Sequence, residues 1–152
     1  MISQKSKYAL KALTVLAKEY GKAPVQIVDI AEKEQISRNF LELILLELKN
    51  QGILHSRKGR RGGYSLARPP QSISVGLVLR MTGGPLAMLP CVSKTAYRRC
   101  EECDDERACG IRMVMKEVRD ATAKILDATS LADLVKRSQL AALGPEALEF
   151  SI

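Results

Sequence analysis

The sequence contains no tryptophan, a single histidine and only 4% aromatic residues. Its core must therefore be built mainly from Leu, Ile, Val, Ala and Met. The lone histidine, His55, lies 36 positions from the nearest cysteine, and no identifiable motif pairs two carboxylates. Enzymes need a nucleophile with a base, or a metal with an open site and a group that transfers protons. We therefore predict that the protein is not an enzyme.

Long apolar runs are also missing. No stretch approaches the roughly 18 residues of a membrane span, and residues 1–7 lack the apolar segment of a signal peptide. These absences predict a cytoplasmic protein with no membrane partner. In that compartment cysteines serve more often as metal ligands or redox thiols than as structural disulfides.

The net charge of +7 is carried by one half of the chain. Residues 1–70 contain 13 Lys and Arg against 6 Asp and Glu, a balance of +7, whereas residues 71–152 contain 11 of each kind. Positive charge confined in this way predicts a polyanionic partner such as nucleic acid.

Residues 26–67 have the pattern of a helix-turn-helix followed by a two-stranded ribbon. A first helix is expected over 27–34. A second begins after Ser37, whose hydroxyl can cap it, and ends near Gly52. Apolar residues wrap much of this second helix, but its length and the internal Glu42 and Glu47 favour a helix over a strand.

The ribbon is expected to form from strands at 53–57 and 64–67, joined by a loop rich in glycine and cations. In such an arrangement the second helix enters the major groove of DNA, while a basic wing reaches phosphates or the minor groove. The expected DNA-binding residues are Ser37, Arg38 and Asn39 on the helix and Arg57, Lys58, Arg60 and Arg61 on the wing.

Helical patterns also flank this motif. Residues 3–20 predict an amphipathic helix that packs against it, and residues 74–82 predict a short helix. From Gly110 onward, apolar residues recur at steps of three and four, which indicates a coiled-coil-like seam. Since palindromic DNA requires a dimer, we expect this seam to pack on a second copy of the chain. The expected dimer interface is Ile111, Val114, Val118, Ala121 and Ile125.

The chain ends with a helix expected over 131–139, which Ser130 and Asp133 open as a capping box. The predicted fold is mainly α: a winged helix-turn-helix with a two-stranded wing and a long C-terminal dimerisation helix. Its expected parts are a DNA-binding domain (1–85), a cysteine-rich sensor loop (86–109), the dimerisation helix with the short last helix (110–139) and a tail (140–152).

The sensor loop holds all four cysteines, Cys91, Cys100, Cys103 and Cys109. Four thiolates within 19 residues can converge on one metal centre, because thiolate is the soft ligand that iron–sulfur clusters and zinc share. Arg98, Arg99, Arg107 and Arg112 surround them, and we expect these cations to lower the thiol pKa values. The spacing leaves four alternatives: an iron–sulfur cluster, a structural zinc, a thiol–disulfide switch, and cysteines without a metal or redox role.

Several motifs of the chain resemble those of the Rrf-type winged-helix regulators of bacteria. The most specific is Gly59-x-x-Gly62-Gly63-Tyr64-x-Leu66-Ala67 of the wing; others are Ile30-Ala31-Glu32, Gly52-Ile53-Leu54 and Ser130-Leu131-Ala132-Asp133-Leu134. The resemblance covers residues 1–138. It implies a homodimeric, sequence-specific transcription factor, usually a repressor, that binds a palindromic operator in double-stranded DNA.

In many members of this family three loop cysteines hold a [2Fe–2S] or [4Fe–4S] cluster, whose state controls DNA affinity. The resemblance therefore favours an iron–sulfur cluster that senses iron, redox or nitric-oxide status. Cys91, Cys103 and Cys109 match the family positions, whereas Cys100 is an additional thiol. A second departure is Gln35, which stands in the turn where the family often has a small residue such as glycine.

The charge asymmetry also fits a DNA-independent module that binds acidic proteins. Preference for one DNA sequence over scrambled duplex, together with salt dependence, discriminates between the two functions.

Overall fold

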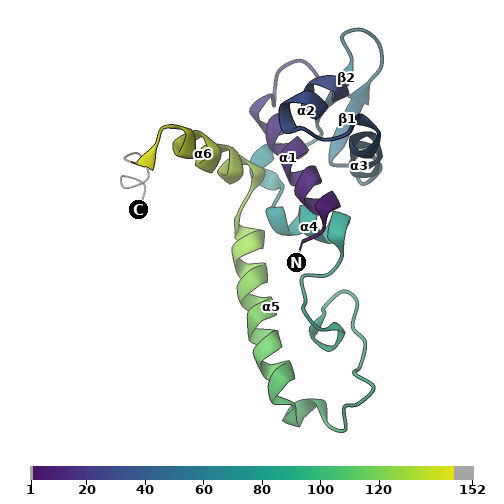
Figure 1. Ribbon diagram of the computed structural model, residues 1–152, viewed down its shortest axis with the longest axis vertical. Coiled ribbons are helices and arrows are strands. Elements are labelled where there is room, and N and C mark those ends of the chain that lie inside the picture. Colours follow the sequence, from purple (N-terminus) through teal and green to yellow (C-terminus); the bar gives the residue numbers. More distant parts are fainter. Residues whose placement is uncertain (1, 146–152) are drawn as a thin grey trace.

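The computed structural model describes residues 2–145 and shows a helical body from which one long helix extends (Figure 1). The helices are α1 (Gln4–Lys18), α2 (Ile27–Glu34), α3 (Arg38–Asn50), α4 (Val75–Gly83), α5 (Gly110–Ala128) and α6 (Leu131–Ala142). The strands are β1 (Leu54–Arg57) and β2 (Gly63–Leu66), and the 3₁₀ turns are η1 (Pro70–Ser72), η2 (Pro90–Val92) and η3 (Glu106–Ala108). The mainly helical fold with one two-stranded ribbon confirms the predicted fold class.

The core lies where α1, α2, α3 and the start of α6 meet. One face of α1 supplies Ala9, Leu13 and Leu16, and Leu131 at the first turn of α6 is fully buried against the same cluster. Tyr8 and Phe40 pack edge to face at the rim, with ring centroids 5.6 Å apart. This packing holds α3 from one side only and leaves its other side open.

Local signals determine where α3 begins and ends. Ser37 is its N-cap, and the Ser37 hydroxyl accepts a hydrogen bond from the backbone N–H of Phe40 at 3.4 Å. The helix ends at Asn50, and Gly52 has a φ of 79°. Before it, Gln35 closes α2 with a φ of 55°, the one positive φ at a non-glycine residue within 2–145.

The wing is an antiparallel pair in which Leu54 lies opposite Leu66 and Arg57 opposite Gly63. Val25 adds a bridge to Tyr64, with N–H···O distances of 2.9 and 2.8 Å, and so anchors the ribbon to the segment before α2. Gly63 makes this approach possible, because a Cβ there would lie 2.3 Å from the Val25 carbonyl oxygen. β1 is one residue shorter than predicted, and β2 has the predicted length but begins and ends one residue earlier.

One side-chain ion pair and two backbone hydrogen bonds help to join the body to the C-terminal helices. The Arg80 guanidinium on α4 donates two hydrogen bonds to the Asp127 carboxylate on α5, at 2.6 and 2.9 Å. The Val75 N–H donates to the Thr129 carbonyl and the Leu131 N–H to the Ile73 carbonyl. The junction between α5 and α6 is therefore attached to the start of α4.

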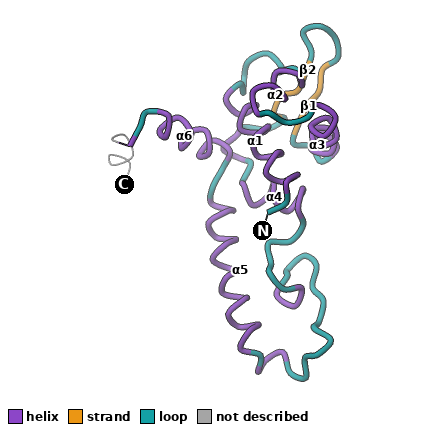
Figure 2. Tube along the Cα trace, in the orientation of Figure 1, coloured by secondary structure: helices purple, strands orange, loops and turns teal. Residues whose placement is uncertain are grey.

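The remainder of α5 runs away from the body beside the loop that follows α4, as the tube trace shows (Figure 2). α6 begins with the expected capping box of Ser130 and Asp133. It continues to Ala142, three residues beyond the predicted end at 139, so the prediction that a tail starts at 140 is wrong. Residues 146–152 of that predicted tail lie outside the described residues. No helix within 2–145 is long and apolar enough to cross a bilayer.

Candidate nucleic-acid interface and cysteine pocket

The outward face of α3 carries a mixed set of side chains. Four apolar residues, Leu41, Ile44, Leu45 and Leu48, are buried and form the inner stripe. The predicted contact residues Ser37, Arg38 and Asn39 are exposed at the start of the helix. The other exposed residues are Glu42, Leu43, Leu46, Lys49 and Asn50.

The wing places its four cations in solvent. Arg57, Lys58, Arg60 and Arg61 are all exposed, and none of them forms an ion pair within residues 2–145. The Gln26 side-chain amide donates a hydrogen bond to the Arg60 carbonyl at 2.6 Å and so holds the tip of the loop. Between α2, α3 and the wing lies a hollow of about 710 Å³, lined in part by Lys49, Arg57, Lys58 and Arg60. Its wall is therefore strongly cationic.

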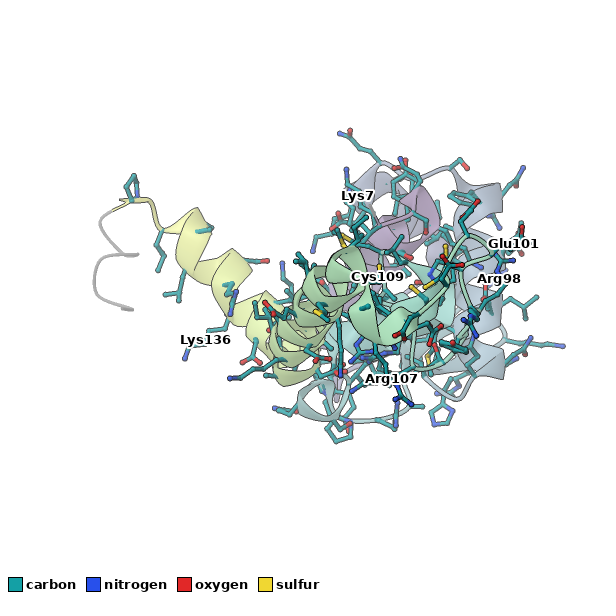
Figure 3. All side chains as sticks on the ribbon, turned by 90° about the horizontal axis from the view of Figure 1, so that it is seen from below. Lys7, Arg98, Glu101, Arg107, Cys109 and Lys136 are labelled. Carbon is teal, nitrogen blue, oxygen red and sulfur yellow. The ribbon has the colours of Figure 1, made fainter. Side chains whose placement is uncertain are left out.

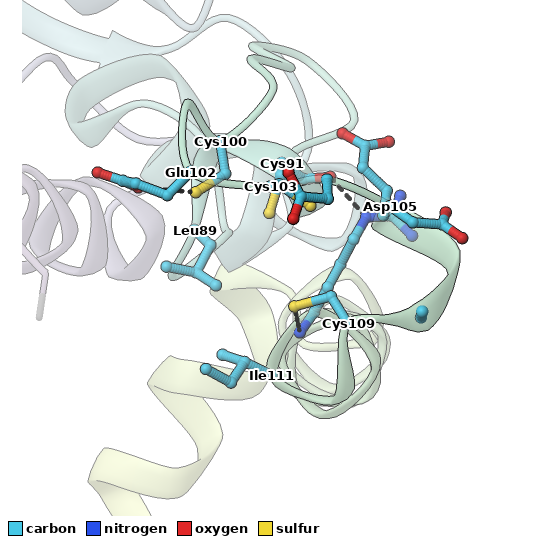
Figure 4. A pocket seen from close by; sticks show the side chains of 12 residues that line it. Leu89, Cys91, Cys100, Glu102, Cys103, Asp105, Cys109 and Ile111 are labelled. Carbon is cyan, nitrogen blue, oxygen red and sulfur yellow. Dashed lines mark hydrogen bonds between the residues drawn. The ribbon is translucent and has the colours of Figure 1, made fainter.

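All four cysteines line one pocket of about 560 Å³ between the loop and the start of α5 (Figure 4). Cys91 is buried in η2, Cys103 and Cys109 are half-buried, and Cys100 is exposed; all four are free thiols. In Figure 4, Cys91, Cys100 and Cys103 come from the loop side of the pocket and Cys109 from the start of the helix. Figure 3, which views the molecule from that end of α5, shows Arg98 and Glu101 at the outer side of the loop, opposite Lys136 on α6.

The thiols share a pocket without converging on one point. Within residues 2–145, no three His, Cys, Asp or Glu side chains lie close enough together to hold a metal ion. The donor set nevertheless suits a soft metal, because four thiols face the same space. Ligation by three of them requires the loop to close.

The expectation that arginines lower the thiol pKa values is wrong for two of the cysteines. Burial and the neighbouring Cys109 raise the pKa of Cys103, and the opposing effect of Arg99 is smaller. The backbone N–H of Glu102 favours the Cys100 thiolate, but the hydrogen bond to the Glu102 carboxylate and desolvation outweigh it and raise the pKa of Cys100. The acidic residues of the loop therefore offset its cations.

The pocket is linked directly to α5. Cys109 is the N-cap of that helix, and its sulfur accepts the Arg112 backbone N–H at 3.4 Å. The Arg112 and Arg119 side chains donate to the carbonyls of Cys91 and Val92, at 3.4 and 2.5 Å. The cysteine segment is therefore attached to α5 at two points that lie two turns apart.

The predicted seam of α5 is largely uncovered. Ile111, Val114, Ala121 and Ile125 are exposed, and Ile125 keeps 64% of its surface in solvent. Val118 is half-buried, because it lines a cavity of about 500 Å³ between α5, α1 and α4. Four of the five expected interface residues thus form an open apolar stripe.

Gln26, Lys49 and the exposed leucines of α3 also belong to the surface that α3 and the wing form. The sequence analysis did not identify them. The leucines could have been separated by register. Positions 41, 44, 45 and 48 form one helical stripe, and positions 43 and 46 fall on the opposite side. Gln26 gave no signal, because its contact with Arg60 depends on the tertiary approach of the wing.

Comparison with known proteins identifies relatives along most of the chain. Residues 2–137 match Rrf2, described as an iron-dependent transcriptional regulator. An rrf2-like HTH-type transcriptional regulator of Rhodobacter capsulatus is 43% identical over 145 residues, which cover 93% of this chain and 97% of that protein.

Two solved structures share the fold. The global cysteine regulator CymR of B. subtilis superposes with a TM-score of 0.76 at 30% identity, covering 90% of this chain and 97% of CymR. IscR of T. potens superposes with a TM-score of 0.75 at 28% identity, covering 95% and 93% of the two chains.

Proposed function

Because the chain belongs to the Rrf2 family of transcriptional regulators, we propose that it is a homodimeric repressor that recognises a palindromic operator in the cytoplasm. In this proposal α3 enters the major groove and the wing contacts the DNA backbone or the minor groove. The observation that carries it is the joint exposure of the polar start of α3 and of four wing cations with no ion-pair partner within residues 2–145.

The proposed contacts divide by chemistry. Arg57, Lys58, Arg60 and Arg61 neutralise phosphates, which contributes affinity without regard to sequence. Arg38 and Asn39 have the side chains that pair with guanine and adenine edges in the major groove. Ser37 caps α3 and can also donate its hydroxyl to a phosphate.

The wing is tested with the double substitution Arg60→Ala and Arg61→Ala. Affinity should fall for every duplex, and the slope of log affinity against log salt should become shallower by about 0.9 for each phosphate that the variant no longer neutralises. The matched control is Lys136→Ala with Arg137→Ala, which removes the same charge from exposed positions of α6. An unchanged slope in the wing variant would show that the wing does not contact DNA.

The apolar stripe of α5 supports the dimer. A stripe of Ile111, Val114, Ala121 and Ile125 in solvent is stabilised when it packs on its twin across a two-fold axis, and the two-fold axis matches a palindrome. Each aliphatic side chain that becomes fully buried contributes about 1.5–3 kcal/mol. Val118 would complete the interface at its inner edge.

The sensor in this proposal is an iron–sulfur cluster held by Cys91, Cys103 and Cys109, with Cys100 as the fourth ligand or as a replacement thiol. The shared pocket of the four thiols and the iron dependence named for the family support it. When bound, the cluster would supply a centre that responds to oxidants, nitric oxide and iron supply. The chain's own contribution is the pair Arg112 and Arg119, which ties the cysteine segment to α5.

Anaerobic purification and reconstitution test the sensor. The wild-type protein should show a visible charge-transfer absorption and contain iron and sulfide, and Cys103→Ala and Cys109→Ala should lose both. Cys100→Ala serves as the comparison, since it retains the absorption if Cys100 is a spare thiol. If the wild-type protein is colourless and holds one tightly bound zinc, the cysteines bind a structural metal and not a cluster.

A thiol–disulfide switch is the second candidate for the same regulator. One observation favours it: within residues 2–145 no group of His, Cys, Asp or Glu side chains is arranged to hold a metal ion. A reversible disulfide in metal-free protein, detected by mass spectrometry before and after reduction, would support this candidate.

A further inference from the structure

Two large leucines point outward from the middle of α3. Leu43 keeps 66% of its surface in solvent and Leu46 keeps 45%, although the same helix buries four other aliphatic residues. They lie three residues apart and therefore share one face, one turn above the other. The hydrophobic core already takes four buried aliphatic side chains from α3, so it does not require Leu43 and Leu46.

The surroundings of the two leucines are polar and cationic. By helical register, Asn39 and Asn50 lie beside them on the same exposed face. One edge of that face carries Arg38 and Lys49 together with the exposed carboxylate of Glu42. The opposite edge is occupied by Glu47, which forms an ion pair with Lys5 of α1. The leucines thus form a small apolar centre inside a surface that attracts polyanions.

The charge of this surface decides what covers the leucines. A protein partner with an apolar patch would have to accommodate Arg38, Lys49 and the wing cations around it. The major groove of DNA offers negative charge at its phosphate rims and, on its floor, one apolar group: the 5-methyl of thymine. Both parts of the surface then have a complementary partner.

We propose that Leu43 and Leu46 read thymine methyl groups and so determine which bases the operator carries opposite the middle of α3. This inference rests on the proposed DNA-binding function and adds specificity residues to it. Arg38 and Asn39 supply hydrogen bonds to base edges near the start of the helix, whereas the leucines exclude water from the methyl groups further along. A cytosine at those positions would present an N4 amino group to an apolar side chain and leave that donor unpaired.

The test uses the full-length protein and the duplex that it selects from a random-sequence pool. Each thymine of one half-site is replaced in turn by deoxyuridine, which removes the 5-methyl group and keeps every hydrogen-bonding group. For the wild type we expect a loss of affinity of about three- to fivefold at one or two thymines, the value for burying one methyl group.

The same DNA series is then measured with Leu43→Ala and Leu46→Ala. Each variant should bind the unmodified duplex more weakly, and the deoxyuridine penalty should disappear at the thymine that the missing side chain contacts. Asn39→Ala is the matched control on the same face: it should bind more weakly but keep the full deoxyuridine penalty. Affinity for non-specific DNA and its salt slope should stay at wild-type values in the leucine variants, which reports an intact fold and wing.

Two results would overturn the inference. One is a wild-type protein for which deoxyuridine is neutral at every thymine of the half-site. The other is a penalty that persists unchanged in both leucine variants. Failure of the proposed function looks different, because no duplex would then be enriched from the pool over scrambled DNA.

Discussion

At the scale of single residues, Gln35 bears a conformation that its side chain disfavours. Its φ of 55° lies in the left-handed region, which costs a residue with a Cβ about 1–2 kcal/mol, whereas glycine adopts it without that cost. The turn between α2 and α3 therefore stores strain at the entrance to the proposed recognition helix.

Gln35→Gly should raise the free energy of unfolding by about 0.5–1 kcal/mol, because the relieved strain exceeds the extra entropy of glycine in the unfolded chain. Chemical denaturation measures the change. Gln35→Ala is the control and should bring no gain, since alanine keeps the Cβ. A glycine variant less stable than the wild type would show that the Gln35 side chain makes a contact that outweighs its strain.

A second residue-scale prediction concerns Gly63 of the wing. A methyl group there would meet the Val25 carbonyl oxygen at 2.3 Å, and the φ of 140° adds strain. Gly63→Ala should cost about 1–3 kcal/mol and weaken DNA binding through the displaced wing. Gly59→Ala, with a φ of 103° and nothing within 4 Å of the added atom, isolates the backbone strain. Equal losses in the two variants would argue against the clash.

At the scale of elements, the connection between α4 and α5 determines how the body meets the long helix. The bidentate contact of Arg80 with Asp127 joins them, and Gly76 leaves the space for that carboxylate. The hydrogen bonds from Arg80 lower the pKa of Asp127 below its usual value. Because the folded pKa is the lower one, the stabilisation is complete above the unfolded pKa of about 3.9 and is lost as the pH falls through the folded value.

Asp127→Asn should therefore reduce stability at pH 7 and have little effect in acid. The side chain is 44% exposed, so solvent screening limits the loss to about 0.2–1 kcal/mol. Urea denaturation from pH 7 down to pH 2 measures it, and the curves of the two proteins should converge at the acid end. Glu117→Gln, at an exposed position of α5 without an ion-pair partner within residues 2–145, provides the control. A constant offset at every pH would show that the variant disturbs packing rather than charge.

At the scale of the whole molecule, the monomer leaves the stripe of α5 in solvent and extends α5 away from the body (Figure 1). Both features are explained if two copies pair along α5 and each presents one recognition helix. In such a dimer the cysteine pocket lies beside α5. The hydrogen bonds of Arg112 and Arg119 would then connect the proposed sensor to the spacing between the two recognition helices.

Ile125→Glu should convert the dimer to monomers, because a charge would be buried without a partner in the interface. Sedimentation velocity at micromolar concentration measures the state, and affinity for a full palindrome should fall toward that for a half-site. Met113→Glu is the matched control, since Met113 is also exposed on α5 but lies off the seam by helical register. Substitution of Ile125 tests the interface more cleanly than substitution of Val118. Val118 is partly buried within its own subunit, so a charge there would also disturb the fold of the monomer. A wild-type monomer would remove the basis of this arrangement.

Local patterns predicted most of the helices and the wing to within a few residues. Ser37 and Ser130 marked helix starts, and each caps a backbone N–H only three residues further along the chain. The end of α6 was misplaced, because no glycine or proline follows Gln139 until Gly144. The thiol pKa values were misjudged for two reasons: the effect of the nearby Glu102 carboxylate on Cys100 was overlooked, and the burial that raises the pKa of Cys103 depends on the fold.

The sequence by itself determined the winged helix-turn-helix, the cationic wing and the placement of four thiols in one loop, because capping, periodicity and turn chemistry act over a few residues. Only the tertiary structure decided how Gln26 holds the wing and that Cys91 is buried beside α5 while Cys100 is exposed. These properties depend on what packs against each side chain from distant parts of the chain, and no local pattern contains that information.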